Sequence, residues 1–312
     1  MKVSGFTFIR NAIRYQFPVV ECIRSVLPMV DEFVVAVGDS DDGTEELVRS
    51  IGDPRIFVVP SRWNPNLRTG GYVLAQQTNV ALLNCTGTWA VYIQGDEAIH
   101  ERDHDHLRRV MEKYAADDRV ESLSLHRTDF VGDYRTVYRR ADDLCVRIVK
   151  PHRFVLSRGD AAGFTVHPKY KERGRRITTV DTGTPIFHYM DIRTPEGFAA
   201  KGSASHSLWQ EHGPRSLPSF DEHFRKSYAR RFLRRYEGSH PAPLGERIAA
   251  HAYDFDIDSP LVRSVLSRRE RKHLVREFLA RNVSSAFRVG AGSSRIVGRE
   301  LPAQGSGLLT LV

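Results

Sequence analysis

Carboxylates end a long apolar run in the first third of the chain. The residues at 89–93 are apolar or aromatic, and Gln94-Gly95-Asp96-Glu97 follows directly. Such a run is typical of a buried strand, and acidic side chains after it lie at the carboxyl edge of a sheet, where α/β folds bind ligands. Carboxylates there hold a divalent cation, which in turn holds phosphate oxygens. The residues indicate either a site for a nucleotide or another phosphorylated ligand, or only a helix capped by Asp96 or Glu97.

A second acidic turn follows an earlier strand. The expected strand at 32–37, apolar from Phe33 onwards, leads into Gly38-Asp39-Ser40-Asp41-Asp42-Gly43-Thr44, and a helical pattern at 45–50 comes next. Strand, acidic turn and helix in this order form a βαβ unit with a polar crevice. Asp39 is placed where a carboxylate can accept hydrogen bonds from a ribose or a base. Asp42, nearer to the helix, is at least as well explained as its cap.

Strands and helices alternate around these two turns, which predicts an α/β fold. The strands expected in the first half are 3–9, 32–37, 55–60 and 89–93, and the helices are 18–27, 45–50 and 72–84. Further strands are expected at 121–126, 146–150, 153–156 and 185–191. The second and third of these would form a ribbon with the first. Between the third strand and its helix lie two glycines, Gly70 and Gly71, which would let backbone amides approach a phosphate or would simply form a turn.

These segments together resemble the nucleotide-binding half of inverting family-2-type glycosyltransferases with the GT-A fold. The resemblance rests on the acidic turn at 38–44, on Gln77-Thr78-Asn79 and on Gln94-Gly95-Asp96-Glu97, and it spans roughly residues 1 to 200. It implies a mixed sheet flanked by helices and a nucleotide-sugar donor. Asp39 would contact the nucleoside and Asp96 the diphosphate through a metal. The further donor-binding residues that we expect are Arg68, Gly71, Asn79, Gln94 and Lys201.

The resemblance also implies a divalent cation, Mn²⁺ or Mg²⁺. Gln94 stands where the family commonly has the first carboxylate of an Asp-x-Asp motif, and an amide adds no charge, so the metal dependence is left open. His188, at the end of an apolar strand, would be a metal ligand together with Asp96, or else a core histidine with a satisfied hydrogen bond. Arg193 and Lys201 would neutralise the departing diphosphate.

In this family a carboxylate in the second half of the domain removes the proton from the acceptor hydroxyl. Asp160, in a short loop after a strand, is the first candidate for this base, although an Asp beside a glycine is equally typical of a turn. Asp191 is the second candidate. The residues expected on the acceptor side are Glu97, His100 and Glu101. The mixed charges at 100–106 suit the first turn of a helix better than a zinc site.

The carboxyl-terminal third differs in composition, and we expect three parts: a catalytic domain at 1–205, a basic helical extension at 206–288 and a flexible tail at 289–312. Four aromatic residues recur every four positions, which predicts an aromatic stripe on one helix. They are Phe224, Tyr228, Phe232 and Tyr236. Such a basic amphipathic helix packs on the catalytic domain or lies on an anionic membrane face.

The composition of the chain restricts the partners and the cellular location that we expect. The 312 residues carry a net charge of +8, which favours anionic partners. There is no run of about 20 apolar residues and no signal-peptide pattern, and Cys22, Cys85 and Cys145 lack metal-ligand spacing. A cytoplasmic protein is expected, with peripheral contact to the inner face of the membrane through the basic helices.

The predicted reaction is transfer of a sugar, with inversion, from a nucleotide sugar to a hydroxyl of a saccharide or lipid-linked acceptor, in cell-surface polysaccharide or glycolipid biosynthesis. One alternative is a non-catalytic basic module that binds a nucleotide, nucleic acid or a membrane surface. Nucleic acid is not the expected partner, because no recognition motif for it is found. A nucleotidyltransferase is the other alternative, but a Gly-rich, lysine-bearing loop after the first strand is missing.

Overall fold

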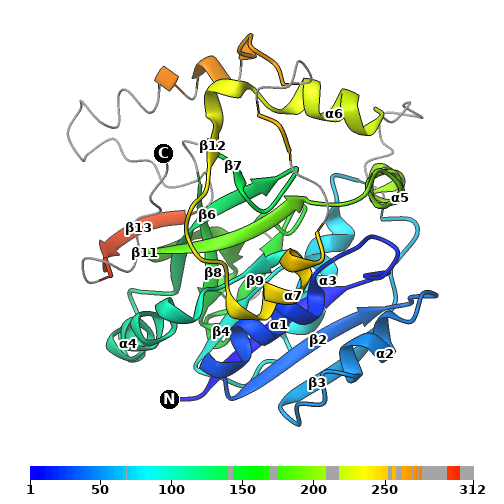
Figure 1. Ribbon diagram of the computed structural model, residues 1–312. Coiled ribbons are helices and arrows are strands. Elements are labelled where there is room, and N and C mark those ends of the chain that lie inside the picture. The colour runs from blue at the N-terminus through cyan, green and yellow to red at the C-terminus, as the bar shows by residue number, and fades with distance from the viewer. Residues whose placement is uncertain are drawn as a thin grey trace.

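The described part of the chain forms one mixed β-sheet with helices on both faces (Figure 1). The computed structural model describes residues 1–67, 69–139, 143–168, 174–208, 218–251, 255–257, 262–268, 270–272, 274–275 and 294–302. The main path of the sheet has the order β3-β2-β1-β4-β8-β6-β11-β10-β9. The predicted α/β class with a mixed, helix-flanked sheet is therefore confirmed.

The first half of the chain supplies the parallel part of the sheet. Its strands are β1 (Val3–Ile9), β2 (Glu32–Gly38), β3 (Ile56–Ser61) and β4 (Trp89–Tyr92). The helices between them are α1 (Val19–Val26), α2 (Thr44–Arg49) and α3 (Tyr72–Leu82), with the 3₁₀ turn η1 (Leu27–Met29) after α1. All of these lie where the sequence predicts them. The carboxyl ends of β1, β2 and β4 consequently meet at one edge, because the three strands run parallel.

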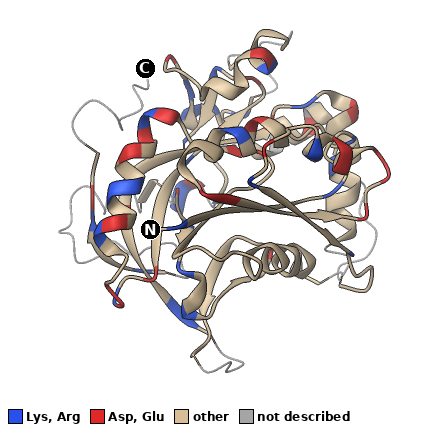
Figure 2. Cartoon of the chain, turned by 90° about the horizontal axis from the view of Figure 1, so that it is seen from below, with Lys and Arg blue, Asp and Glu red and all other residues tan. Residues whose placement is uncertain are grey.

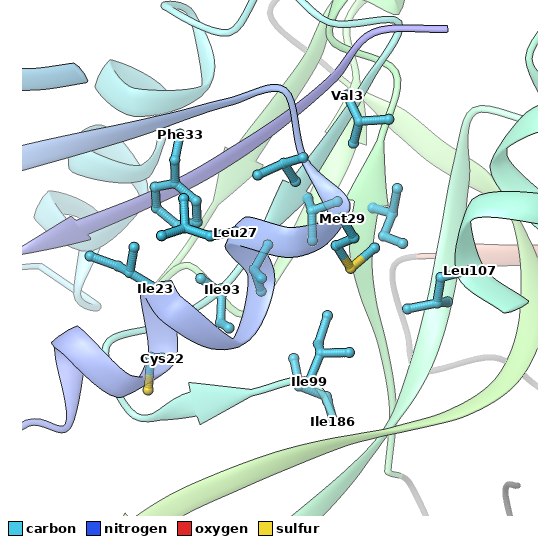
Figure 3. Packing of buried hydrophobic residues seen from close by; sticks show 14 of the residues in the cluster. Val3, Cys22, Ile23, Leu27, Met29, Phe33, Ile93, Ile99, Leu107 and Ile186 are labelled. Atoms are coloured by element: carbon cyan, nitrogen blue, oxygen red, sulfur yellow. The ribbon is translucent and has the colours of Figure 1, made fainter. Parts of the chain in front are cut away.

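Alternation along these strands explains why both faces are covered. In β2, Phe33, Val35 and Val37 pack with α1, whereas Val34 and Ala36 pack with α3 on the opposite face. A strand covered on both faces is continuously apolar, and β2 is buried throughout. Figure 3 shows the first of these clusters, with Ile23 and Leu27 against the sheet.

The second half of the chain extends the sheet with both antiparallel and parallel pairs. The added elements are β5 (Glu97–Ala98), η2 (Glu101–Asp103), α4 (His104–Tyr114), β6 (Ser122–Val131), β7 (Thr136–Tyr138), β8 (Leu144–Val149), η3 (Pro151–Arg153), β9 (Val155–Arg158), β10 (Gly163–Val166) and β11 (Arg175–Asp191). We predicted that the strand after β8 joins a ribbon with β6, and this is wrong, since β9 pairs with β10. β8 does pair with β6, as predicted.

Strand β11, with 17 residues, is the longest of the described elements. Its amino-terminal part pairs with β13 and its carboxyl end with β5. It runs parallel to β6, with a register shift between Asp181 and Pro185. Its carboxyl end pairs with the short strand β5, so that His188 lies opposite Glu97. This pairing brings His188 beside the segment that follows β4.

The carboxyl-terminal third folds back on this sheet. It contains α5 (Pro195–Ser207), α6 (Phe220–Ser227), η6 (Arg230–Phe232), β12 (Leu233–Arg235), η7 (Ala242–Leu244), α7 (Gly245–Ala249) and β13 (Ser294–Arg299). The prediction of one aromatic helix is wrong, because α6 ends at Ser227 and β12 then pairs with β7. The four aromatic side chains of the stripe are nevertheless all buried. The four side chains are therefore buried by packing, although they do not belong to the one regular helix that their spacing suggests.

The prediction that residues 289–312 form a flexible tail does not hold for part of this range. Residues 294–299 form β13, which runs parallel to the amino-terminal part of β11, and Arg299 makes an ion pair of 2.9 Å with Asp181. The rest of the predicted tail, at 289–293 and 303–312, lies outside the described residues. The other proposed divisions, at 205 and 288, stay predictions.

Two further observations concern the surface. No helix among the described residues is long and apolar enough to cross a membrane. Figure 2, a view from below, shows basic and acidic positions side by side on the helices instead of separated into one basic face.

A histidine joins the bulged part of β11 to β6. His126 Nε2 lies 2.8 Å from Asp181 Oδ1, and Nδ1 lies 3.3 Å from Asp143 Oδ1. Burial would lower the pKa of His126, but hydrogen bonds and charge attraction from the two carboxylates outweigh it and raise this pKa to about 9. The imidazolium form is therefore favoured by the fold.

We predict that His126→Gln lowers the free energy of unfolding more at about pH 6 than at about pH 9.5. The pKa in the folded state lies above the unfolded value, so the stabilisation is fully present below about pH 6.5 and is lost as the pH rises through about 9. Urea unfolding of both proteins at the two pH values measures the difference. An equal loss at both would show that the charge of His126 does not contribute.

Candidate active site

The turn between β4 and β5 carries Asp96 to the carboxyl edge of the sheet. Its geometry is set by reciprocal bonds: the Glu97 backbone N–H donates to the Gln94 carbonyl at 3.0 Å, and the Gln94 N–H donates to Glu97 Oε2 at 3.2 Å. Gly95 fits here because a Cβ would come within 2.8 Å of the Ile9 side chain. The short turn therefore leaves Asp96 little freedom to move.

A buried ion pair supports this turn from below. Arg147, on β8, donates from Nε to Glu97 Oε2 at 2.8 Å and from Nη2 to Oε1 at 2.7 Å, and its guanidinium lies 5.3 Å from the centre of the Tyr92 ring. Burial would raise the pKa of Glu97, but Arg147 holds this pKa below its usual range. We predicted that Glu97 lines the acceptor side, and this is wrong, because its side chain is buried and fully engaged.

We expect Arg147→Met to lower the free energy of unfolding by about 3–5 kcal/mol, since it leaves the Glu97 charge buried without its partner. The double variant Glu97→Met/Arg147→Met should recover most of this loss, because no unpaired charge remains. Urea unfolding measures both. A single variant as stable as the wild-type protein, or a double variant less stable than the single one, would contradict the argument.

Asp96 lies among basic side chains. We call these residues, together with the second carboxylate that contacts His188, the Asp96 cluster: Asp96, Asp129, His188, Arg193 and Lys201. Asp96 Oδ2 lies 3.2 Å from Arg193 Nη2 and 3.2 Å from Lys201 Nζ, and Oδ1 lies 3.6 Å from His188 Nε2. Burial would raise the pKa of Asp96, but attraction to Lys201, His188 and Arg193 lowers it to about 2. Asp96 is therefore ionised over the whole physiological range of pH.

His188 is oriented by a second carboxylate. Its Nδ1 lies 2.6 Å from Asp129 Oδ1, which also pairs with Arg127 at 3.0 Å. Because Nδ1 faces Asp129, Nε2 is the ring nitrogen that faces Asp96 Oδ1, at 3.6 Å. A carboxylate that orients a histidine in this way is typical of metal ligands. Asp96 Oδ1 and His188 Nε2 therefore fit a divalent cation whose other ligands are phosphate oxygens and water.

The protein alone offers few ligands for such an ion. Within the described ranges, no group of three or more His, Cys, Asp or Glu side chains is placed to hold a metal. Asp96 Oδ2 is already engaged by two cations, and Glu97 by Arg147. Any metal here would depend on oxygen atoms of a bound ligand.

Arg193 precedes α5 and Lys201 lies within this helix, whose start contacts the loop after β1. Arg193 Nε donates to the Tyr15 carbonyl at 2.9 Å, and Gln16 exchanges hydrogen bonds with Thr194, the N-cap of α5. Both cations lie over the ring of Phe17, at 4.9 and 4.8 Å from its centre. Burial and the neighbouring Arg193 lower the pKa of Lys201, although Asp96 opposes this. The loop after β1 and the start of α5 thus hold two positive charges side by side.

Asp191, at the end of β11, lies next to this cluster. His223 Nε2 on α6 is 2.8 Å from Asp191 Oδ2, and the Tyr228 hydroxyl donates to the same oxygen. Burial would raise the pKa of Asp191, but His223, Tyr228 and the charge of Lys201 hold this pKa well below its usual range. Sequence reasoning missed His223 and Tyr228, because only the fold of residues 219–228 brings them to β11.

A more open part of the same edge surrounds Asp39. Asp39 follows β2 and is 54% exposed, and Arg10 Nε, after β1, lies 3.4 Å from its Oδ1. The Arg10 guanidinium also lies 5.4 Å from the centre of the Trp63 ring. Trp63 packs against Gly38, and its buried Nε1–H has no partner among the described residues. The sequence did not single out Arg10 or Trp63, although an aromatic residue in the loop after β3 was a visible signal.

Two predicted donor-binding residues have structural partners instead. The Gly71 backbone N–H donates to the Leu208 carbonyl at 3.2 Å, so it is not available to a phosphate. Asn79 holds β9, since it donates to the Ser157 carbonyl at 3.1 Å and accepts from the Ser157 N–H at 2.7 Å. Both predictions are corrected accordingly. Arg68 lies outside the described residues, and the role of the half-buried Gln94 side chain stays a prediction.

The predicted acceptor-side residues His100 and Glu101 contact a later part of this chain. His100 Nε2 lies 2.9 Å from Ser239 Oγ, and Glu101 Oε2 accepts from the Ala242 N–H at 3.2 Å. These contacts attach residues 239–242 to the start of α4 and do not support a role in acceptor binding. Asp160 is exposed in the turn between β9 and β10, where its role as a base stays a prediction.

No family model and no curated protein matches the chain. Solved structures similar to it include Staphylococcus aureus TarS, at 16% identity over 49% of this chain and 29% of that one, with a TM-score of 0.33. TarS 1–349 in complex with UDP-GlcNAc is 20% identical over 46% of this chain and 38% of that one, with a TM-score of 0.32.

A further similar structure is Mycobacterium tuberculosis glucosyl-3-phosphoglycerate synthase with Mn²⁺, UDP and phosphoglyceric acid. It is 13% identical over 69% of this chain and 80% of that one, with a TM-score of 0.35. The chain spans less than a third of full-length TarS. These are partial likenesses of fold.

Proposed function

We propose that the protein transfers a sugar from a nucleotide-sugar donor to a hydroxyl acceptor. The observation that carries this proposal is the Asp96 cluster at the carboxyl edge of the sheet, where one ionised carboxylate meets two fixed cations and an oriented histidine. The edge continues over β1 to Asp39, which follows β2, and in our proposal the diphosphate lies at the Asp96 cluster and the nucleoside near Asp39.

The donor diphosphate is expected at Arg193 and Lys201. Arg193 and Lys201 are the two cations that lie against Asp96, and guanidinium groups bind phosphate oxygens in pairs. Both cations are held in place before the donor arrives, so little reorganisation is needed as charge develops on the leaving group. A bound Mn²⁺ or Mg²⁺ would be held by Asp96 and His188 and would supply further neutralisation of that charge.

The nucleoside is expected between the side chains of Asp39 and Trp63. Asp39 is exposed and can accept hydrogen bonds from ribose hydroxyls or from a base N–H, while Arg10 limits its motion. UDP is present with similar folds in the two proteins compared above, and uridine nucleotides are therefore the first to test.

Asp191 is our choice for the general base, because it ends β11 two residues before Arg193 of the Asp96 cluster, whereas Asp160 lies in the turn between β9 and β10. It would take the proton of the acceptor hydroxyl while the acceptor oxygen attacks the anomeric carbon, and the bond from that carbon to the diphosphate would break on the opposite side. The product is an inverted glycoside, together with a nucleoside diphosphate that leaves next to Arg193 and Lys201. His223 would hold the Asp191 carboxylate in position.

We predict that one nucleoside diphosphate or nucleotide sugar, tested with UDP and UDP-GlcNAc first, raises the melting temperature of the protein. A ligand at about 100 times its Kd adds roughly 2.7 kcal/mol to the free energy of unfolding. Asp96→Asn and Lys201→Gln should each weaken this shift, while Glu45→Gln on the exposed surface of α2 should not. Addition of Mn²⁺ should enlarge the shift in the wild-type protein and not in Asp96→Asn. No shift with any donor of a broad panel would refute the proposal.

Once a donor is known, Asp191→Asn should lower kcat by about 10²–10⁴-fold with little change in KM for the donor, as expected for loss of a general base. Release of nucleoside diphosphate, measured with saccharide and lipid-linked acceptors, gives both constants, whereas release of pyrophosphate would identify a nucleotidyltransferase. Asp160→Asn is the matched comparison. If it abolishes turnover while Asp191→Asn does not, the base has been assigned to the wrong carboxylate.

A further inference from the structure

A charged cavity lies at the opposite end of β11 from the Asp96 cluster. It has a volume of about 770 Å³ and is formed by the loop before β6, the start of β11 and the strand β13. Its lining is rich in arginine, and we call it the arginine groove: Tyr114, Asp117, Asp118, Arg119, Val120, Glu121, Arg153, Arg175, Arg176, Thr178, Val180, Arg295 and Val297. Cavities of this size hold small-molecule ligands in many proteins.

The register of two strands builds the floor of the groove. Side chains two residues apart on a strand point to the same face, so Arg176, Thr178 and Val180 of β11 lie in one row. Arg295 of β13 is the register partner of Thr178, and it points to the same side. Two guanidinium groups from neighbouring strands therefore converge on one cavity.

The charges of the groove do not cancel. Three of its five arginines pair with its three carboxylates: Arg119 with Asp117 at 2.8 Å, Arg153 with Asp118 at 3.3 Å, and Arg175 with Glu121. Arg176 and Arg295 make no ion pair with any described residue. The groove thus keeps an excess of two positive charges, both at its floor strands.

The groove is separate from the Asp96 cluster. Thr178 and His188 are ten positions apart on β11, which corresponds to roughly 30 Å of extended chain. The cluster is at the carboxyl ends of the strands, whereas the groove is at the amino-terminal ends of β6 and β11. A ligand in one place does not reach the other.

We propose that the arginine groove is a second ligand site, which takes a saccharide-sized molecule bearing a phosphate group. Two unpaired guanidinium groups match a dianionic phosphate in charge and can each donate two hydrogen bonds to it. The volume exceeds that of phosphate alone, so the remaining space accommodates the sugar ring to which the phosphate is attached. The phosphate can belong to a free sugar phosphate or to a phosphorylated unit of a longer glycan. This inference does not depend on the proposed sugar transfer.

The test is calorimetric titration of the full chain with glucose 6-phosphate, glucose and inorganic phosphate. Glucose 6-phosphate should bind, inorganic phosphate more weakly, and glucose not at all. Arg176→Gln/Arg295→Gln should weaken the binding of glucose 6-phosphate at least tenfold. A matched double variant, Arg24→Gln/Arg49→Gln, loses the same net charge at exposed positions of α1 and α2 and should bind within twofold of the wild-type protein.

Asp96→Asn separates the two sites, since binding in the groove should be unaffected by it. Loss of binding in Asp96→Asn would assign the ligand to the Asp96 cluster, and equal weakening in both double variants would reduce the effect to net charge. Either result, or no binding of glucose 6-phosphate to the wild-type protein, overturns the proposal. A phosphorylated oligosaccharide that binds tighter than glucose 6-phosphate would identify a glycan as the source of the phosphate.

Discussion

The buried ion pair between Glu97 and Arg147 is the interaction on which the arrangement of the site depends. Both side chains are almost completely inaccessible to solvent, and their two hydrogen bonds join β8 to Glu97, the first residue of β5. Such a pair contributes little net stability compared with apolar side chains, but it is costly to break. It therefore specifies one position for the turn that carries Asp96, and the pairing of β5 with His188 on β11 follows from that position.

In the proposed function, the charges around Asp96 allow one carboxylate to serve a diphosphate site without the second carboxylate of an Asp-x-Asp motif. Arg193 precedes α5 and Lys201 lies within it, and the loop after β1 holds the start of this helix in place. Positive charge that comes from fixed side chains reduces the charge that a metal must provide. In our proposal, the amide of Gln94 is thereby compensated by cations from another part of the chain.

The last third of the chain is part of the same structure and not an appendage. Residues of α6 and the segment after it contact Asp191, β12 extends the sheet beside β7, and β13 pairs with β11. Both ends of β11 consequently depend on later segments: His223 and Tyr228 engage its carboxyl end, and Arg295 completes the arginine groove at its amino end. The two candidate sites are thus connected by a single strand.

The parallel half of the sheet could be predicted from the sequence, because its strands are continuous apolar runs and its helices are short and regularly spaced. Local pattern alone also placed Asp39 and Asp96 at strand ends, and the resemblance to a family suggested His188 and Lys201. The partners of Gly71, Asn79, Glu97 and His100 could not be predicted, since they lie between 50 and 139 residues away in the sequence. Whether a polar residue binds a ligand or another part of the chain was decided by tertiary structure, because a buried hydrogen-bonding group takes whichever partner the fold brings within about 3 Å.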